Sequence, residues 1–313
     1  MAESDTRHGS VDLAARVHRV LAVACARLGL SPRDAELVRL HSNAVFRLPG
    51  EQLVVRIATN PRAWASVAAS VQVTRWLAAR GLPTVEPVDV PGQPLLVDGM
   101  VVSLWRLVPL APGVRGTACD LGRILRALHD QPQPPVAPPP LAHPLQEIER
   151  IVHEHAHVLA PSHRSWLRQR IGELREAWDA LAFPRPQGLV HGDAHLGNLL
   201  TAADGRVVLG DWDRVGLGPR EWDLTQVHYT HRRFGRPAAC DLDAIAACYG
   251  WDIRDWPGLD TLIAIRELSG LSPYIRTAPA KPAARREVAW RLETLMRGDV
   301  QARWQPPADG GRR

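Results

Sequence analysis

Lysine is almost absent from this chain of 313 residues, because Lys281 is the only one and every other basic side chain is an arginine. The formal net charge is +5, but the arginines are spread out and form no extended run. A nucleic-acid-binding surface normally gathers its positive charge into a patch or stripe. We therefore expect no nucleic-acid partner, and any site that usually employs a lysine must be built differently here.

Cysteine is also scarce, and no C-x-x-C pair occurs among Cys25, Cys119, Cys240 and Cys248. This spacing suggests neither a disulfide framework nor a thiolate metal site. Long apolar runs are missing too, since no stretch approaches the roughly 18 residues of a membrane span, and the N-terminal MAESDTRHGS is polar. We expect a protein of the reducing cytoplasm with no membrane partner.

One motif raises the possibility of a zinc hydrolase. Residues 153–157 read HEHAH and match H-E-x-x-H, and Glu176 lies 19 residues beyond His157. Helical phase speaks against this interpretation, because His153 and His157 share the polar face of their predicted helix and Glu176 points away from the apolar stripe of the next one. We expect these side chains to be solvated surface.

The first 108 residues predict a small sheet with one crossing helix. Helical periodicity covers 10–28, with Ser10 as a possible N-cap, and 62–80, which ends before Gly81. Four strands are expected in NAVFRLP, QLVVRIA, VEPVDV and MVVSLWRLV, with Pro49-Gly50 as a hairpin turn and PGQPLLVDG as a second turn.

The remaining residues predict a larger and mainly helical region. PLAPGVRGT (109–117) is rich in proline and glycine and is typical of a hinge. We therefore predict a two-lobed α+β fold: a small N-terminal lobe (1–108), a hinge (109–117), and a larger C-terminal lobe (118–313).

The stretch LVHGDAHLGNLLTAADGRVVLGDWD (189–213) carries the strongest chemical signal. Asn198 follows Asp193 by five residues and Asp211 follows Asn198 by thirteen, which are the spacings of the kinase set H-R-D-x-x-x-x-N and D-F-G. Phosphoryl transfer needs a positioned hydroxyl and neutralised phosphate charge. Asp193 can accept the hydroxyl proton, and an amide oxygen with a carboxylate suits Mg²⁺.

HGDAHLGN, VVLGDWD and GPREWDL together resemble the aminoglycoside phosphotransferase family, whose members share the protein-kinase-like fold. The resemblance implies that Asp193 is the catalytic base and that Asn198 and Asp211 hold Mg²⁺. It also implies that His191 supports the catalytic loop.

Two further positions of this region belong to the same resemblance, and a third, Asp213, lies two residues past Asp211 on the same strand face if the strand continues. His195 matches the second histidine of H-G-D-x-H, and it is either a loop residue or an active-site contact. Asp223 matches an acid that braces the loop through backbone hydrogen bonds. Asp213 could join the metal site or face solvent, and we favour solvent.

The chain departs from the family pattern where nucleotide should bind. Arg56 stands in place of the phosphate-contacting lysine, and arginine is not interchangeable with lysine. The helix over 62–80 has no acid to pair with Arg56, and Ser70 aligns with that acid. G-x-G-x-x-G is also missing, so Ser42 and Asn43 are the candidate phosphate contacts. The resemblance implies that the backbone of Trp105 to Leu107 binds adenine.

These observations predict a phosphotransferase that uses Mg²⁺ and ATP, with GTP left open, to phosphorylate a hydroxyl group of a small molecule. The resemblance implies that the N-terminal lobe binds nucleotide, that the C-terminal lobe carries catalysis and substrate binding, and that the acceptor is an aminoglycoside-like compound, an amino alcohol, a sugar or a related metabolite. Acidic and basic residues balance in the C-terminal third, so the sequence does not favour a strongly cationic substrate. Arg56 and its missing partner support an alternative, a nucleotide-binding pseudokinase that acts as a sensor or scaffold. The protein is expected to be a monomer or homodimer.

Overall fold

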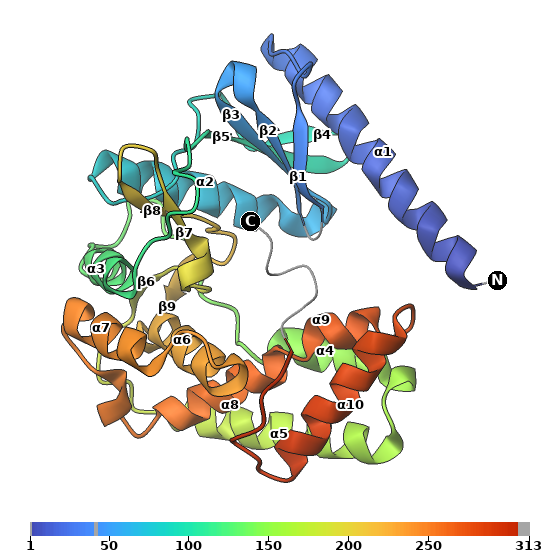
Figure 1. Cartoon of the computed structure of the whole chain (residues 1–313), viewed down its shortest axis with the longest axis vertical. Coiled ribbons are helices and arrows are strands. Elements are labelled where there is room, and N and C mark those ends of the chain that lie inside the picture. Colours follow the sequence, from blue (N-terminus) through green and yellow to red (C-terminus); the bar gives the residue numbers. More distant parts are fainter. Residues whose placement is uncertain (1, 41–42, 306–313) are drawn as a thin grey trace.

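The computed structural model describes residues 2–40 and 43–305. A five-stranded antiparallel sheet forms the upper part in Figure 1, in the order β1–β2–β3–β5–β4. Its strands are β1 (Glu36–Leu40), β2 (Asn43–Leu48), β3 (Leu53–Ala58), β4 (Leu95–Val97) and β5 (Met100–Arg106). The lower part is mainly helical, so the predicted α+β fold with a small N-terminal sheet lobe is confirmed.

Side chains along β3 point alternately to the two faces of the sheet, and this decides which of them pack against α1 (Ala2–Leu28). Val55 and Ile57 of β3 are buried against α1, together with Phe46 of β2. Because successive side chains of a strand point to opposite faces, Arg56 projects from the other face of the sheet. The first helix begins at Ala2, so the expected start at Ser10 is wrong.

The second helix, α2 (Trp64–Ala79), follows a short 3₁₀ turn and confirms the helix expected over 62–80. Its buried side chains Val73 and Leu77 share one hydrophobic cluster with the helical part. After α2, the N–H of Val85 donates to the carbonyl of Leu209, and the N–H of Leu209 donates to Pro83. One core therefore crosses the predicted boundary, and the division into 1–108, 109–117 and 118–313 stays a prediction.

Helices α3 to α10 make up most of the lower part in Figure 1. They are α3 (Ala118–His129), α4 (Gln146–Glu154), α5 (Pro161–Asp179), α6 (Glu221–Phe234), α7 (Ala239–Tyr249), α8 (Leu259–Ser269), α9 (Ser272–Thr277) and α10 (Pro282–Met296). Two small sheets lie between these helices and α2 in Figure 1. One pairs β6 (Gly188–Val190) with β9 (Gly216–Gly218), and the other pairs β7 (Leu199–Thr201) with β8 (Val207–Leu209).

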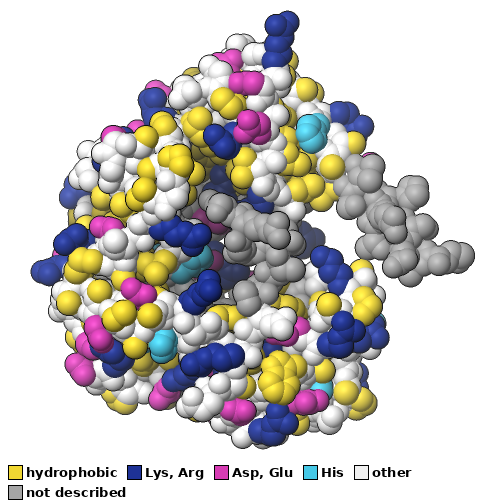
Figure 2. All heavy atoms as spheres, in the orientation of Figure 1, with side chains coloured by type: hydrophobic (Ala, Val, Ile, Leu, Met, Phe, Trp, Pro, Cys, Tyr) yellow, Lys and Arg dark blue, Asp and Glu magenta, His cyan; other side chains and the backbone are white. Residues whose placement is uncertain are grey.

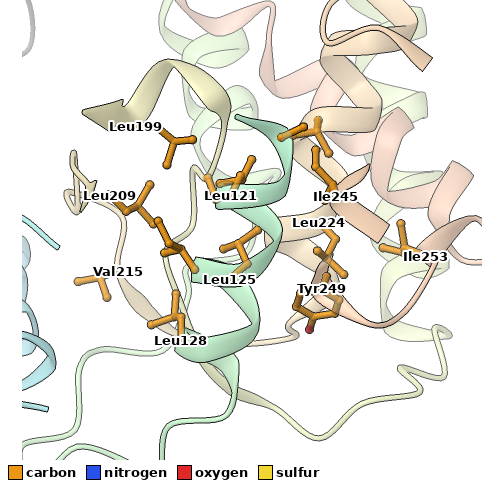
Figure 3. Close-up of a cluster of buried hydrophobic side chains, with 14 of the residues drawn as sticks. Leu121, Leu125, Leu128, Leu199, Leu209, Val215, Leu224, Ile245, Tyr249 and Ile253 are labelled. Carbon is orange, nitrogen blue, oxygen red and sulfur yellow. The ribbon is translucent and has the colours of Figure 1, made fainter. Parts of the chain in front are cut away.

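Helix α3 anchors these small sheets. Figure 3 shows Leu121, Leu125 and Leu128 of α3 between the strand residues Leu199 and Leu209 on one side and the helical α6–α7 side chains on the other. The three leucines are almost completely buried. The loops that follow β6 and β8 are thus held on a packed core, which gives their polar side chains fixed positions.

The strand predicted at VEPVDV (85–90) is not formed. This segment runs beside β5, where the N–H of Val88 donates to Leu104, but Pro87 makes only an isolated bridge to Trp105. Proline has no N–H for a ladder, which is the physical reason. Strand β4 instead lies inside PGQPLLVDG, which was expected to be a turn.

The expectation of no disulfide is wrong, because Cys119 of α3 and Cys248 of α7 are bonded, with a Cα–Cα distance of 5.3 Å. The two helices approach closely at Gly122, where a Cβ would lie 2.7 Å from the carbonyl oxygen of Ile245. Residues 129 positions apart meet only through this packing, so their spacing could not reveal the pair. The prediction of a reducing cytoplasmic location rested in part on unpaired cysteines, and the disulfide removes this support.

Across residues 2–40 and 43–305, no helix combines the length and apolar character needed to cross a membrane.

Candidate active site

The loop that carries Asp193 starts directly after β6. Gly192 has φ of 86°, in the left-handed region that favours glycine. A Cβ at this position would overlap the carbonyl oxygen of Arg214. Glycine is therefore required where the protein-kinase motif has arginine, because two backbone segments meet there.

Asp223, at the start of α6, fixes the backbone of this loop. Its fully buried carboxylate accepts hydrogen bonds from the N–H groups of His191 and Gly192, each at 2.7 Å, and from Nε2 of His129 at 3.1 Å. Burial would raise the pKa of Asp223, but the hydrogen bond and charge interaction with His129 and the contacts with His191 outweigh it and lower the pKa. The carboxylate is thus kept ionised and holds the loop in one conformation.

His191 is completely buried and acts on the loop rather than on a substrate. Its Nε2 lies 2.9 Å from the carbonyl of Gly210 and its Nδ1 accepts from the N–H of Asp193 at 3.3 Å. A neutral ring protonated on Nε2 satisfies both contacts. His191 therefore ties the strand before Asp211 to the backbone of Asp193.

Asp193 and Asn198 form one unit. The side-chain amide of Asn198 donates to the carbonyl oxygen of Asp193 at 2.9 Å. No described donor bonds the Asn198 Oδ1, which leaves this oxygen for a cation. The Asp193 carboxylate is 39% exposed, so it is open to a substrate while its backbone is held.

Asp211 supplies the second oxygen donor, from a loop residue with φ of 62°. Across the described parts of the chain, no group of three or more His, Cys, Asp and Glu side chains is arranged to hold a metal. The oxygens of Asn198 and Asp211 nevertheless fit Mg²⁺, which usually takes one or two protein ligands and completes its shell with phosphates and water.

Arg56 reaches both acids of the D-W-D motif. Its Nη2 lies 3.1 Å from Asp211 Oδ1 and 2.6 Å from Asp213 Oδ2. Asn43 also donates to Asp213 at 2.6 Å. Asp213 therefore does more than face solvent, since its carboxylate pairs with Arg56 and Asn43 while its side chain stays 36% exposed. Trp212, between the two acids, is buried.

The two carboxylates titrate in opposite directions. Burial would raise the pKa of Asp211, but the guanidinium groups of Arg56 and of Arg39, 3.5 Å away, lower it to about 2. Burial and the neighbouring Asp211 charge raise the pKa of Asp213 despite Arg56. At neutral pH the pair thus presents concentrated negative charge, which guanidinium groups neutralise in this structure and a divalent cation could neutralise equally well.

A family model described as the phosphotransferase enzyme family, APH, matches residues 34–262. This range covers most of the chain and contains the loop, both acids of the D-W-D motif and Asp223. The chain belongs to the phosphotransferase enzyme family. The resemblance inferred from the three sequence motifs is confirmed.

Solved structures of related fold cover nearly the whole phosphotransferase chain. The amicoumacin kinase hAmiN, in complex with AMP-PNP, Ca²⁺ and Ami, has a TM-score of 0.69 and 14% identity over 88% of this chain and 91% of that chain. A choline/ethanolamine kinase family protein from Mesorhizobium loti has a TM-score of 0.61 and 19% identity, with 90% and 96% covered. Choline kinase LicA from Streptococcus pneumoniae has a TM-score of 0.60 and 11% identity, with 89% and 99% covered. At these identities the similarity establishes the kinase-like fold.

The residues expected to bind the nucleotide are only partly brought together in this phosphotransferase. Ser42 lies outside the described residues. Asn43 and Trp105 line a small cavity with Arg56 and the buried Ser70, whose hydroxyl has no hydrogen-bond partner among the described atoms. Ser70 thus faces the site but cannot replace an acid, and the partners of Arg56 are Asp211 and Asp213 instead.

The backbone of the predicted hinge is partly committed to the sheet. The N–H of Leu107 donates to Gln52 at 2.9 Å, and the N–H of Arg106 donates to Glu86 at 2.8 Å. The N–H of Leu107 is therefore engaged in this conformation, and the expectation that the backbone of Trp105 to Leu107 binds adenine stays a prediction. Trp105 is buried, and its indole N–H donates to Ser103 at 2.9 Å.

His195 lies beside Asp193 but is held by its own loop. Its Nδ1 accepts from the N–H of Gly197 at 3.0 Å and caps the turn that leads to Asn198. Burial lowers the pKa of His195, and the Asp193 carboxylate opposes this only in part. A neutral His195 that supports the turn is the role that these contacts indicate.

Arg266 of α8 is a site residue that the sequence interpretation missed. Its guanidinium stacks 3.6 Å from the ring centre of Trp222 and donates to the carbonyls of Trp222 at 2.9 Å and Gly192 at 3.3 Å. Its Nη1 lies 3.9 Å from Asp193 Oδ1. Burial lowers the pKa of Arg266 to about 10, with Asp193 acting against it, so the group stays cationic at neutral pH.

Helical phase could have identified Arg266. It follows Leu262 by four residues and Ile263 by three, so it belongs to the buried stripe of α8. A charged residue in such a stripe is rarely buried without a partner. That signal pointed to a paired arginine, although only the fold shows that Asp193 is the acid beside it.

The HEHAH motif forms no metal site. His153 and His157 are exposed, as is Glu176 on α5. The helix α4 ends at Glu154, so the two histidines do not even share one α-helix. Rejection of the zinc interpretation agrees with this geometry.

Proposed function

We propose that this phosphotransferase transfers the terminal phosphoryl group of ATP to a hydroxyl group of a small molecule. The observation that carries the proposal is the single unit formed by the Asp223-braced loop, Asp193, and the amide of Asn198. A fixed base next to an oxygen donor for a cation is what in-line phosphoryl transfer requires. Support also comes from the family and from the fold of hAmiN, which was solved with AMP-PNP and Ca²⁺.

Asp193 would act as the base. The acceptor hydroxyl oxygen forms a bond to the γ-phosphorus, the bond from that phosphorus to the β,γ-bridging oxygen breaks, and ADP leaves. The hydroxyl proton passes to the Asp193 carboxylate. Asn198 and Asp211 would hold Mg²⁺, which neutralises phosphate charge when it is bound.

Arg56, with Asn43, is the side chain best placed to meet the phosphates. Its side chain extends from β3 to Asp211 and is only 14% exposed. Arginine can bind phosphate oxygens through two N–H groups at once. Trp105 lines the same small cavity as Arg56 and would contact the nucleotide there.

The test is ADP release measured with Mg-ATP and a panel of hydroxylated small molecules. Asp193→Asn should lower turnover by about 100-fold or more, because general-base catalysis commonly contributes that much. Binding of Mg-ATP, followed by thermal shift, should persist. Asp89→Asn is the matched control, since that carboxylate is 98% exposed and remote from the loop. Wild-type turnover in Asp193→Asn would refute the assignment of the base.

A nucleotide-binding pseudokinase is the second candidate. The observation in its favour is that Arg56 and Arg39 already occupy Asp211, while α2 offers no acid to Arg56. A sensor of this kind would bind Mg-ATP without releasing ADP, even with acceptors present. Measurable intrinsic ATP hydrolysis that depends on Asp211 would decide for the enzyme.

A further inference from the structure

The acceptor side of the site is marked by arginines that the phosphoryl-transfer machinery does not use. Arg214 follows the D-W-D motif directly, and its backbone packs against Gly192 of the catalytic loop. Arg266 lies 3.9 Å from the Asp193 carboxylate and interacts electrostatically with Arg214. The backbone of Arg214 thus adjoins the catalytic loop, and Arg266 places a guanidinium group beside Asp193.

A third arginine joins them through one carboxylate. Glu147 of α4 lies between Arg214, with Nη2 at 3.5 Å, and Arg276 of α9, with Nη2 at 3.6 Å. These separations are ion-pair contacts longer than a normal hydrogen bond. Among the described residues, the guanidinium groups of Arg214 and Arg276 donate no hydrogen bond. Both are exposed, so their N–H groups are free for a ligand.

The charge on this side is therefore positive. The carboxylates of Asp211, Asp213 and Asp223 are already assigned to the cation site and the loop brace. The Asp193 carboxylate opposes Arg266, and Glu147 is shared between Arg214 and Arg276, so two carboxylates face three guanidinium groups. Figure 2 shows Lys and Arg side chains bordering the hollow between the two parts of the molecule. Almost all of the side chains in this colour are arginines, because Lys281 is the only lysine of the chain.

We propose that the acceptor carries an anionic group, a carboxylate or a phosphate, close to the hydroxyl that receives the phosphoryl group. Arg214 and Arg276 would bind this anion, since planar guanidinium groups match both oxyanions. A polycationic acceptor would meet like charge and carboxylates that are already paired. The inference rests on the proposed function and deepens it by naming the class of acceptor.

The first experiment compares acceptors of different charge by ADP release from the full chain with Mg-ATP. Glycerate and ribose 5-phosphate are the anionic probes, glycerol and ribose the neutral ones, and ethanolamine and kanamycin the cationic ones. We expect kcat/KM for an anionic probe to exceed that of its neutral counterpart by about tenfold or more. Preference for glycerate over ribose 5-phosphate, or the reverse, separates a carboxylate from a phosphate. Preference for the cationic probes overturns the inference while the phosphotransferase proposal stands.

The second experiment measures binding and does not depend on finding the acceptor. Malonate, inorganic phosphate and spermidine are titrated against the protein saturated with Mg-AMP-PNP, and the melting temperature is recorded. Malonate or phosphate should stabilise the wild-type chain, and Arg214→Gln and Arg276→Gln should each weaken that binding by about tenfold. Stabilisation by spermidine alone, or no anion binding that depends on these arginines, overturns the inference.

Two further variants make the result specific. Arg168→Gln is the matched control, because Arg168 is an exposed arginine of α5 outside the site, and its anion binding should equal that of the wild type. Glu147→Gln should bind malonate or phosphate at least as tightly as the wild type, since it removes the carboxylate that pairs with Arg214 and Arg276. Loss of anion binding in Glu147→Gln, together with loss of kanamycin turnover, would instead identify a cation site. If the wild-type chain fails to bind Mg-AMP-PNP at all, the proposed function fails, and the anion titration without nucleotide still reports on the arginines.

Discussion

Arg56 crosses from β3 to the loop after β8 and binds Asp211 at 3.1 Å. The two residues are 155 positions apart, and they join the sheet lobe to the residues that would hold the cation. The same guanidinium binds Asp213. Arg56 therefore occupies the place of a cation between two carboxylates.

Removal of Arg56 should strengthen binding of Mg²⁺ in the absence of nucleotide. In Arg56→Gln the carboxylates of Asp211 and Asp213 lose their shared counter-ion, and a divalent cation no longer competes with a guanidinium group. We expect about a tenfold tighter Mg²⁺ affinity by isothermal titration. Arg47→Gln, at an exposed arginine of β2, should leave it unchanged. An unchanged or weaker affinity in Arg56→Gln would show that the Asp211 carboxylate is not part of the cation site.

Asp223 should make the stability of the protein sensitive to acid. Its pKa is lowered in the folded state, so its contribution to the free energy of unfolding is present above its unfolded pKa, near 3.8, and is lost as the pH falls through the folded value. Asp223→Asn should lower the free energy of unfolding by about 3 kcal/mol at pH 7, because an amide cannot accept from two converging N–H groups as a carboxylate does.

Denaturant titration across the acidic range tests this contribution. The variant should lose less stability than the wild type as the pH falls below 4, since the titrating group is gone. Asp89→Asn, which changes an exposed carboxylate, should follow the wild-type curve. Parallel curves for Asp223→Asn and the wild type would contradict the lowered pKa.

Arg266 should control the position of the catalytic loop. In Arg266→Met the Gly192 carbonyl loses a donor, and the ion pair with the Asp193 carboxylate is lost. We expect kcat to fall about tenfold or more, because the loop that bears Asp193 loses a buried anchor. Arg266→Lys keeps the charge and should restore kcat in part. A fall in stability with an unchanged kcat would show that Arg266 only packs against Trp222.

Gly192 should tolerate no side chain. In Gly192→Ala a Cβ must displace the Arg214 backbone in addition to adopting a positive φ. Gly205→Ala is the matched control, since Gly205 has φ of 85° but no atom near its added Cβ. Gly205→Ala should cost only the conformational penalty of about 1 kcal/mol in the free energy of unfolding. Gly192→Ala should cost more and lower kcat by about 100-fold, because the loop that bears Asp193 must shift. Equal effects in the two variants would contradict a close contact at Gly192.

Local patterns predicted the elements whose neighbours are also close in the sequence. The helix over 62–80 and the hairpin at Pro49-Gly50 were correct, because periodicity and turn chemistry act within a few residues. The strand expected at 85–90 does not form. Its neighbour is β5, and Pro87 has no N–H to donate to β5, so only an isolated bridge is made. Strand β4 was missed because it has only three residues and forms by pairing with β5.

The sequence by itself determined the fold class, the family and the set Asp193, Asn198 and Asp211, because the spacing of residues along one loop and its adjoining strand is a property of the chain. Only the tertiary structure decided that Arg56 binds Asp211 and Asp213, that Cys119 meets Cys248, and that Arg266 stands beside Asp193. These contacts join residues far apart in the chain. They depend on how apolar helix and sheet faces pack to exclude water, and a linear pattern does not encode which polar side chains that packing will bring together.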